Sequence, residues 1–289
     1  MEHHRISIIS ALVCSAAITF AVDAPTSAAT GADVQARITK DVAAGRPIVV
    51  HVVVALCDNA NQGIVRVPAA LGNGQDPRSN LYWGALYGLR TFFLKNDWAL
   101  VSASPAEEPR VLDRVVLRRD VKRGDKTVPV FVVAEAWDGA AIKIAIERFL
   151  EMAAGGGKSV LRVKHDATEF DLAVGGAAHA VAYVGHDGLM EFSVVSPRRQ
   201  SSKDAPLSAL VLACTSKTYF AEHLEAAGAH ALLLTTGLMA PEAYTLDVAI
   251  RSWAAGESSA NTQESAAKAY DRFQKCGLRA ARGLFWGAL

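Results

Sequence analysis

The chain has almost no net charge and few cysteines, and each scarcity excludes a class of protein. Lys and Arg number 30 against 29 Asp and Glu, so no excess of charge favours nucleic acid or an anionic membrane as a partner. Only four cysteines are present. Without Cys14, the three at positions 57, 214 and 276 are too few and too widely spaced for a disulfide framework, so at least one thiol should be free.

Long apolar runs are also scarce, apart from one at the N-terminus. Residues 6–22 are mostly apolar, follow Arg5, and lead into the small residues of 23–29. This is the layout of a secretory signal peptide, with cleavage after Ala24 or at Ala28/Ala29. We therefore expect a signal peptide over 1–29 and one mature domain over 30–289, with no integral membrane anchor in the mature chain.

Cys14 raises a second possibility for the same segment. The sequence Leu12-Val13-Cys14-Ser15 suits a lipoprotein signal, except that Val13 is bulky where small residues are favoured. Export to the periplasm or the outside of the cell without a lipid anchor is the preferred interpretation.

Strand-like and helix-like segments alternate over most of the chain, which predicts an α/β fold with a mostly parallel central sheet flanked by helices. A composition of 51 % hydrophobic residues over 289 positions is ample for a large core. The strongest strand signal is the continuous, β-branched run 48–56. Further strands are expected over 111–121 and 128–136 (a hairpin), 160–174, 180–184, 209–213 and 231–235. Helices are expected over 30–46, 81–95, 139–154, 217–227, 242–254 and 262–284, the last interrupted near Gly277 and followed by the aromatic pair Phe285-Trp286.

Two of these apolar runs, 180–184 and 209–213, end at residues with catalytic potential. The first is followed by Gly185-His186-Asp187-Gly188 and the second ends in Ala213-Cys214. If the strands are parallel neighbours, both side chains emerge at the carboxyl edge of the sheet, where open α/β sheets place active sites. An imidazole beside a thiol can lower its pKa or take its proton. The N–H groups of Gly188 and Cys214 would form an oxyanion hole. Alternatively, Cys214 is a core residue and His186 a structural one.

These motifs resemble those of the clan CD cysteine peptidases, which include caspases, legumains, gingipains, clostripain and separase. In that clan a strand ends in His-Gly or His-x-Gly and a later strand ends in Ala-Cys. This chain departs from the commonest form by placing Asp187 between His186 and Gly188. The resemblance covers two short motifs and implies a caspase-like three-layer sandwich with a Cys214–His186 dyad.

The same resemblance implies roles for further residues. Asp58 and Asn59 follow the first strand and open a long polar loop, 58–80, which should lie over the same edge. By resemblance to the legumain branch, Asn59 or Asp58 would orient the histidine, although either residue also suits a simple turn. The segment after the strand 231–235 would supply substrate contacts through Thr235, Thr236 and Glu242. Glu242 follows Pro241, so it also suits the first turn of a helix.

Cofactor chemistry finds little support in the sequence. Gly155-Gly156-Gly157-Lys158-Ser159 looks like the tail of a phosphate-binding loop, but Met152 stands where that motif needs glycine and a helix precedes it. A metal-dependent hydrolase using His179, His186 and nearby carboxylates ranks last, because no HExxH motif or close ligand cluster is present. We expect no metal, no cofactor and no nucleotide.

The sequence thus favours a secreted or periplasmic cysteine endopeptidase, a hydrolase acting on a peptide or protein substrate. The alternative is a catalytically silent caspase-like module that binds a peptide or protein partner in the same cleft. Thiol reactivity distinguishes the two, because an activated cysteine alkylates fast near neutral pH and a structural one does not.

Overall fold

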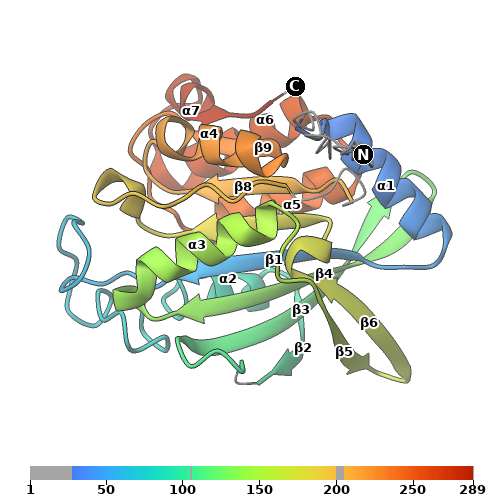
Figure 1. Ribbon diagram of the computed structural model, residues 1–289, viewed down its shortest axis with the longest axis horizontal. Helices are drawn as coiled ribbons and strands as arrows, with labels where there is room; N and C mark the ends of the chain where they lie inside the picture. Colours follow the sequence, from blue (N-terminus) through green and yellow to red (C-terminus); the bar gives the residue numbers. More distant parts are fainter. Residues whose placement is uncertain (1–27, 105, 200–204, 289) are drawn as a thin grey trace, which may run out of the picture.

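A computed structural model describes residues 28–104, 106–199 and 205–288 of the chain (Figure 1). The predicted signal peptide therefore lies outside the described residues, except for its last two positions. No helix within the described ranges is both long enough and apolar enough to cross a membrane.

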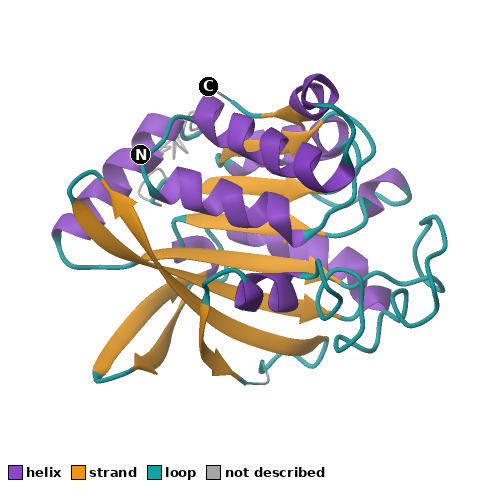
Figure 2. Ribbon diagram, turned by 180° about the vertical axis from the view of Figure 1, so that it is seen from behind, coloured by secondary structure: helices purple, strands orange, loops and turns teal. Residues whose placement is uncertain are grey.

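The fold is an eight-stranded mixed sheet flanked by helices, with a separate two-stranded hairpin (Figures 1 and 2). The strand order is β10-β9-β8-β7-β1-β4-β3-β2, and β4, β1, β7, β8 and β9 run parallel. The strands of the large sheet are β1 (Ile48–Ala55), β2 (Ala99–Ala103), β3 (Val111–Arg123), β4 (Lys126–Trp137), β7 (Ala180–Val184), β8 (Ser208–Leu212), β9 (His230–Thr235) and β10 (Phe285–Trp286). The hairpin consists of β5 (Ser159–His165) and β6 (Thr168–Val174).

Helices cover both faces of the sheet. The α-helices are α1 (Gly31–Ala43), α2 (Leu89–Lys95), α3 (Ile142–Ala153), α4 (Ser216–Ala227), α5 (Ala243–Ala254), α6 (Ser259–Gln274) and α7 (Leu278–Leu284). Short 3-10 turns are η1 (Gly139–Ala141), η2 (Gly175–Ala177) and η3 (Gly188–Met190). In Figure 1, α3 and α4 lie in front of the sheet, with α2 and α5 behind it. The architecture is thus an α/β three-layer arrangement, as the sequence predicts.

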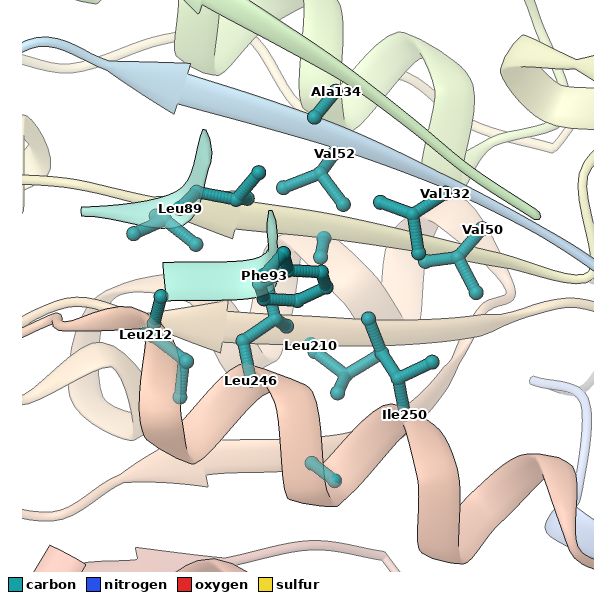
Figure 3. Packing of buried hydrophobic residues seen from close by; sticks show 14 of the residues in the cluster. Val50, Val52, Leu89, Phe93, Val132, Ala134, Leu210, Leu212, Leu246 and Ile250 are labelled. Carbon is teal, nitrogen blue, oxygen red and sulfur yellow. The ribbon is translucent and has the colours of Figure 1, made fainter. Parts of the chain in front are cut away.

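Alternation along the central strands divides the core between these two layers. Val50, Val52 and Val54 of β1 pack with α2 and α5, whereas Val53 packs with α3 and α4 on the other face. Figure 3 shows the first layer, where Phe93 of α2 lies over the sheet. All eight residues of β1 are buried, as expected for a central parallel strand.

Most predicted elements are confirmed, two segments differ, and the edge strand β2 corresponds to no predicted element. The predicted helix 81–95 forms only as α2, Leu89–Lys95, while 81–88 consists of turns. Gly84 and Gly88 lie in this segment, and glycine disfavours helix. The second difference is at the C-terminus, where Phe285-Trp286 is β10, pairing antiparallel with β9, rather than an aromatic end to a helix.

The packing of α2 can be tested by truncating its central aromatic residue. Phe93 is fully buried, and its ring centroid lies 5.0 Å from that of Trp98. We expect Phe93→Ala to lower the free energy of unfolding by about 3–5 kcal/mol, because it leaves a cavity between α2 and the sheet. Chemical denaturation measures this loss. Val195→Ala is the control, since Val195 is 89 % exposed. A loss below about 1 kcal/mol for Phe93→Ala would contradict the packing.

Candidate active site

The strands β7 and β8 deliver His186 and Cys214 to the same position at the carboxyl edge of the sheet. The two strands are parallel neighbours, and their ladder ends with Val184 opposite Leu212. His186 lies two residues beyond Val184 and Cys214 two residues beyond Leu212. Neighbouring strands lie about 4.8 Å apart, so the two backbones leave the sheet side by side. The predicted juxtaposition of these two chain positions is confirmed.

Gly185 allows the chain to turn at the end of β7. Its φ of +154° is one that side-chain-bearing residues rarely adopt, and an added Cβ would lie 2.9 Å from the Ala55 carbonyl oxygen of β1. The Tyr183 hydroxyl, from β7, donates a hydrogen bond of 2.8 Å to the carbonyl oxygen of His186, the residue after Gly185. The His186 backbone is therefore fixed against the ends of β1 and β7.

The thiol of Cys214 lies against the segment after β9. Its Sγ accepts from the Met239 N–H at 3.4 Å and lies 3.6 Å from the Met239 carbonyl oxygen. Cys214 is partly buried, two residues before the start of α4, so the positive end of that helix lies next to it. The Met239 N–H can donate to the sulfur, and the Met239 carbonyl can accept the proton of the thiol.

The His186 side chain is oriented by a carboxylate that the sequence analysis did not identify. Nε2 of His186 lies 2.7 Å from Oε1 of Glu191, which follows η3. In the described part of the chain, no hydrogen bond joins His186 to Cys214. Glu191 had no sequence signal beyond its position five residues after the histidine.

Asp58 and Asn59 do not take the orienting role that the resemblance implied. The Asp58 carboxylate accepts from the Ala60 N–H, and from the Asn61 and Gln75 amides at 2.8 and 2.9 Å. The Asn59 amide bonds with the backbone of Val67 at both its oxygen and its nitrogen. Both residues shape the 58–80 loop, as in the turn interpretation, and the histidine contact belongs to Glu191.

The 58–80 loop nevertheless lies over this edge, as predicted from its place after β1, and contacts Glu191 beside the histidine. The Gly63 N–H donates to Glu191 Oε1 at 2.8 Å. At the base of the loop, buried Asn80 accepts from the Cys57 N–H at 3.1 Å and donates to the Cys57 carbonyl at 2.8 Å. The loop is therefore anchored at β1 and touches the His186 segment at Gly63.

Of the two N–H groups predicted to bind the oxyanion, one already has a hydrogen-bond partner and the other has none within the described ranges. The Gly188 N–H already donates to the His186 carbonyl oxygen at 3.1 Å. A Cβ at Gly188 would lie 2.5 Å from the Phe192 ring, so close packing explains this glycine. The Cys214 N–H has no hydrogen-bond partner within the described ranges. Of the two, only the Cys214 N–H is free to bind an oxyanion in this structure.

The three residues predicted to contact the substrate differ in how accessible they are. Thr235 is fully buried, and its hydroxyl bonds with Ser216 and with the Ala213 carbonyl, so it supports the cysteine turn and cannot touch a substrate. Thr236 is exposed, with its hydroxyl donating to the Gly283 carbonyl at 2.7 Å. Glu242 is partly buried and accepts from the Gln274 amide at 3.1 Å.

Glu242 shares its surroundings with Cys214. Tyr82 and Tyr270 each lie within electrostatic range of both residues. Burial raises the pKa of the Glu242 carboxyl, and the bonds with Tyr244 and Gln274 oppose this only in part. Glu242 and Thr236 thus remain available at this edge, whereas Thr235 does not.

The other cysteines and the second histidine lie elsewhere. Cys57 is buried, and this burial raises the pKa of its thiol to about 11; Cys276 is exposed, and all three described cysteines are free. His179 precedes β7, at the opposite edge from His186, and contacts Asp41 at 3.0 Å. The two histidines therefore cannot share a metal, and the described residues contain no cluster of three or more potential metal-ligating side chains.

A groove of about 750 Å³ lies on another part of the molecule, between α2, α5 and α6. Its walls include Phe92, Tyr244, Arg251, Glu264 and Phe273, but neither His186 nor Cys214. This groove is separate from the candidate active site.

Asp187, between the histidine and Gly188, is buried without a full set of partners. Its Oδ1 accepts from the Leu189 N–H at 3.1 Å, while Oδ2 has no hydrogen-bond partner in the part of the chain that the structure describes. Desolvation raises the pKa of this carboxyl to about 7, against a single opposing hydrogen bond. A carboxylate here destabilises the fold once it ionises.

Stability should therefore fall with rising pH because of Asp187. The unfolded aspartate loses its proton near pH 3.9, whereas the folded one holds it to about 7. Between these values the folded state binds more protons, so the free energy of unfolding decreases as pH rises. Asp187→Asn cannot ionise, and we expect it to be more stable than the wild type at pH 8 by on the order of 1–3 kcal/mol. This gain should vanish near pH 4 in denaturation curves, and a gain of equal size at both pH values would contradict the burial of the charge.

Comparisons with protein-family models, curated proteins and solved structures gave no match to this chain. The chemistry assigned to the site therefore rests on the geometry of its own residues.

Proposed function

We propose that the protein is a cysteine endopeptidase in which Cys214 is the nucleophile and His186 the general base and acid. One observation carries the proposal: equivalent positions beyond the ends of two adjacent parallel strands hold a histidine and a cysteine. In open α/β sheets, this carboxyl edge is where ligands bind and active sites lie.

The backbone around Cys214 supports the same role. Thr215 has a φ of +46°, a left-handed conformation that is costly for a β-branched residue. Strain of this kind is retained where the surrounding structure needs a particular geometry, commonly at active sites. Here it turns the chain sharply from β8 into α4 and leaves Cys214 at the tip of the turn, where its own N–H has no partner among the described residues.

The proposed reaction follows from these groups. Cys214 Sγ attacks the carbonyl carbon of a peptide bond, while the imidazole takes the thiol proton and passes it to the departing amine. The Cys214 N–H stabilises the oxyanion. Water, deprotonated by the same imidazole, then hydrolyses the thioester and restores the thiol.

The wider architecture agrees with a caspase-like sandwich, since helices flank both faces of a mostly parallel sheet. The 58–80 loop and the segment 236–242 border the edge on which the dyad lies. We propose that a peptide binds between them, with Glu242 and Thr236 among its contacts. Export from the cytoplasm is a further proposal, based on the sequence of residues 1–29.

A silent peptide-binding module is the second candidate, and specific contacts favour it. The Cys214 thiol is engaged by both backbone groups of Met239, and the described residues hold no bond between His186 and Cys214. In such a module, the same edge would bind a peptide without cleaving it.

Alkylation kinetics test the proposal with internal references. Iodoacetamide labelling of the three cysteines is followed by mass spectrometry between about pH 5 and 9. We expect Cys214 to label at least about tenfold faster than exposed Cys276 near neutral pH, and His186→Ala to abolish the difference. His165→Ala is the matched control, because His165 lies at the tip of the β5–β6 hairpin. Cys214 labelling no faster than Cys276, or unaffected by His186→Ala, would favour the silent module.

A further inference from the structure

Glu191 joins the histidine of the candidate dyad to the 58–80 loop through one oxygen atom. Its Oε1 lies 2.7 Å from His186 Nε2 and accepts from the Gly63 N–H at 2.8 Å. The imidazole is about nine-tenths buried, whereas the Glu191 side chain is 38 % exposed. An ionised carboxylate is only an acceptor, so both hydrogens point at Oε1.

This contact fixes which imidazole nitrogen carries the proton. A carboxylate at Nε2 holds a hydrogen there and leaves Nδ1 as the acceptor in the neutral ring. Nδ1 of His186 has no hydrogen-bond partner among the described residues. With Nε2 held by Glu191, Nδ1 is the nitrogen of the neutral ring that is left to act as a base.

We propose that Glu191 is the positioning residue of the dyad, and that Gly63 on the 58–80 loop holds Glu191 in place. This inference rests on the proposed function, and it makes the reactivity of Cys214 depend on a loop that does not touch the thiol. A peptide that moves the loop at Gly63 would change the orientation of His186.

Glycine at position 63 is required by this arrangement. A Cβ there would lie 2.0 Å from Glu191 Oε1 and 2.8 Å from its carboxyl carbon. Because the clash involves the far end of a flexible, partly exposed side chain, Gly63→Ala should displace the carboxylate into solvent and leave the fold intact. The substitution thus removes the contact from the loop side, without altering Glu191 or His186.

The first readout is the tautomer of His186, measured from imidazole ¹⁵N chemical shifts. In the wild type at a pH where the ring is neutral, we expect hydrogen on Nε2. Glu191→Ala and Gly63→Ala should both lower the population of this tautomer to that of a free histidine side chain, in which hydrogen on Nε2 is favoured but not exclusive. Glu191→Gln should retain it, because an amide oxygen still accepts from Nε2. A structural role for Glu191 would not produce this pattern.

The second readout is the rate of Cys214 alkylation near neutral pH. We expect Glu191→Ala and Gly63→Ala each to slow it by about tenfold, because a misoriented base contributes less to proton transfer. The double variant should be no slower than either single one, since both remove the same contact. Gly283→Ala is the matched control, because a Cβ there meets nothing within 4 Å. Its labelling rate should equal that of the wild type.

The outcomes separate this inference from the proposed function. If His186→Ala slows Cys214 labelling but Glu191→Ala and Gly63→Ala do not, the dyad stands and the positioning role is overturned. If the two variants slow labelling by amounts that multiply in the double variant, Gly63 does not act through Glu191. If His186→Ala itself has no effect, the dyad and the inference fail together.

Discussion

The parallel pairing of β7 with β8 is the constraint on which the candidate site depends. Both strands are buried along their whole length, and their register is set by the packing of alternate side chains into two helical layers. A slip of one residue would turn every side chain to the other face and remove Tyr183 from its packing with Phe149 and Phe220. The hydrophobic core therefore decides that His186 and Cys214 leave the sheet at equivalent positions.

At the carboxyl edge of the sheet, the segments are held in place by hydrogen bonds with the backbone rather than by apolar packing. Tyr183 and the ends of β1 fix the histidine segment, Thr235 and Ser216 fix the cysteine turn, and Asn80 ties the 58–80 loop to β1. Each of these polar groups is buried and has its partners, so together they rigidify the edge. Asp187 is the exception: it is buried next to the histidine, and one of its carboxylate oxygens has no partner within the described ranges. Burying this carboxyl lowers the stability of the fold, and the favourable packing around it offsets the loss.

The sequence predicted what depends on local pattern. Continuous β-branched runs identified the central strands, and a polar turn between two of them identified the β3–β4 hairpin. The ends of the runs then placed His186 and Cys214 correctly, because in a parallel sheet strand ends meet at one edge. By contrast, the sequence predicts a helix from residue 81 onwards, whereas Asn80 and the nearby glycines hold 81–88 in turns.

Local sequence patterns do not predict which side chains of different loops contact one another. Glu191 was missed, and Asp58 and Asn59 were assigned its role, because nothing local tells which polar side chain of a long loop faces the histidine. Thr235 was expected to be accessible, since a strand end looks the same whether its last residue points to solvent or to Ser216. These outcomes depend on which backbone groups remain to be satisfied at the edge, and only the assembled fold determines that.

The most direct test of the account is covalent capture by a mechanism-based probe. A mixture of peptidyl acyloxymethyl ketones with varied side chains, which are inert to ordinary thiols, is incubated with the protein and analysed by intact mass and peptide mapping. A cysteine endopeptidase should form one adduct, at Cys214, which is lost in both Cys214→Ser and His186→Ala. The absence of any adduct from a folded protein whose Cys276 still reacts with iodoacetamide would contradict the peptidase assignment.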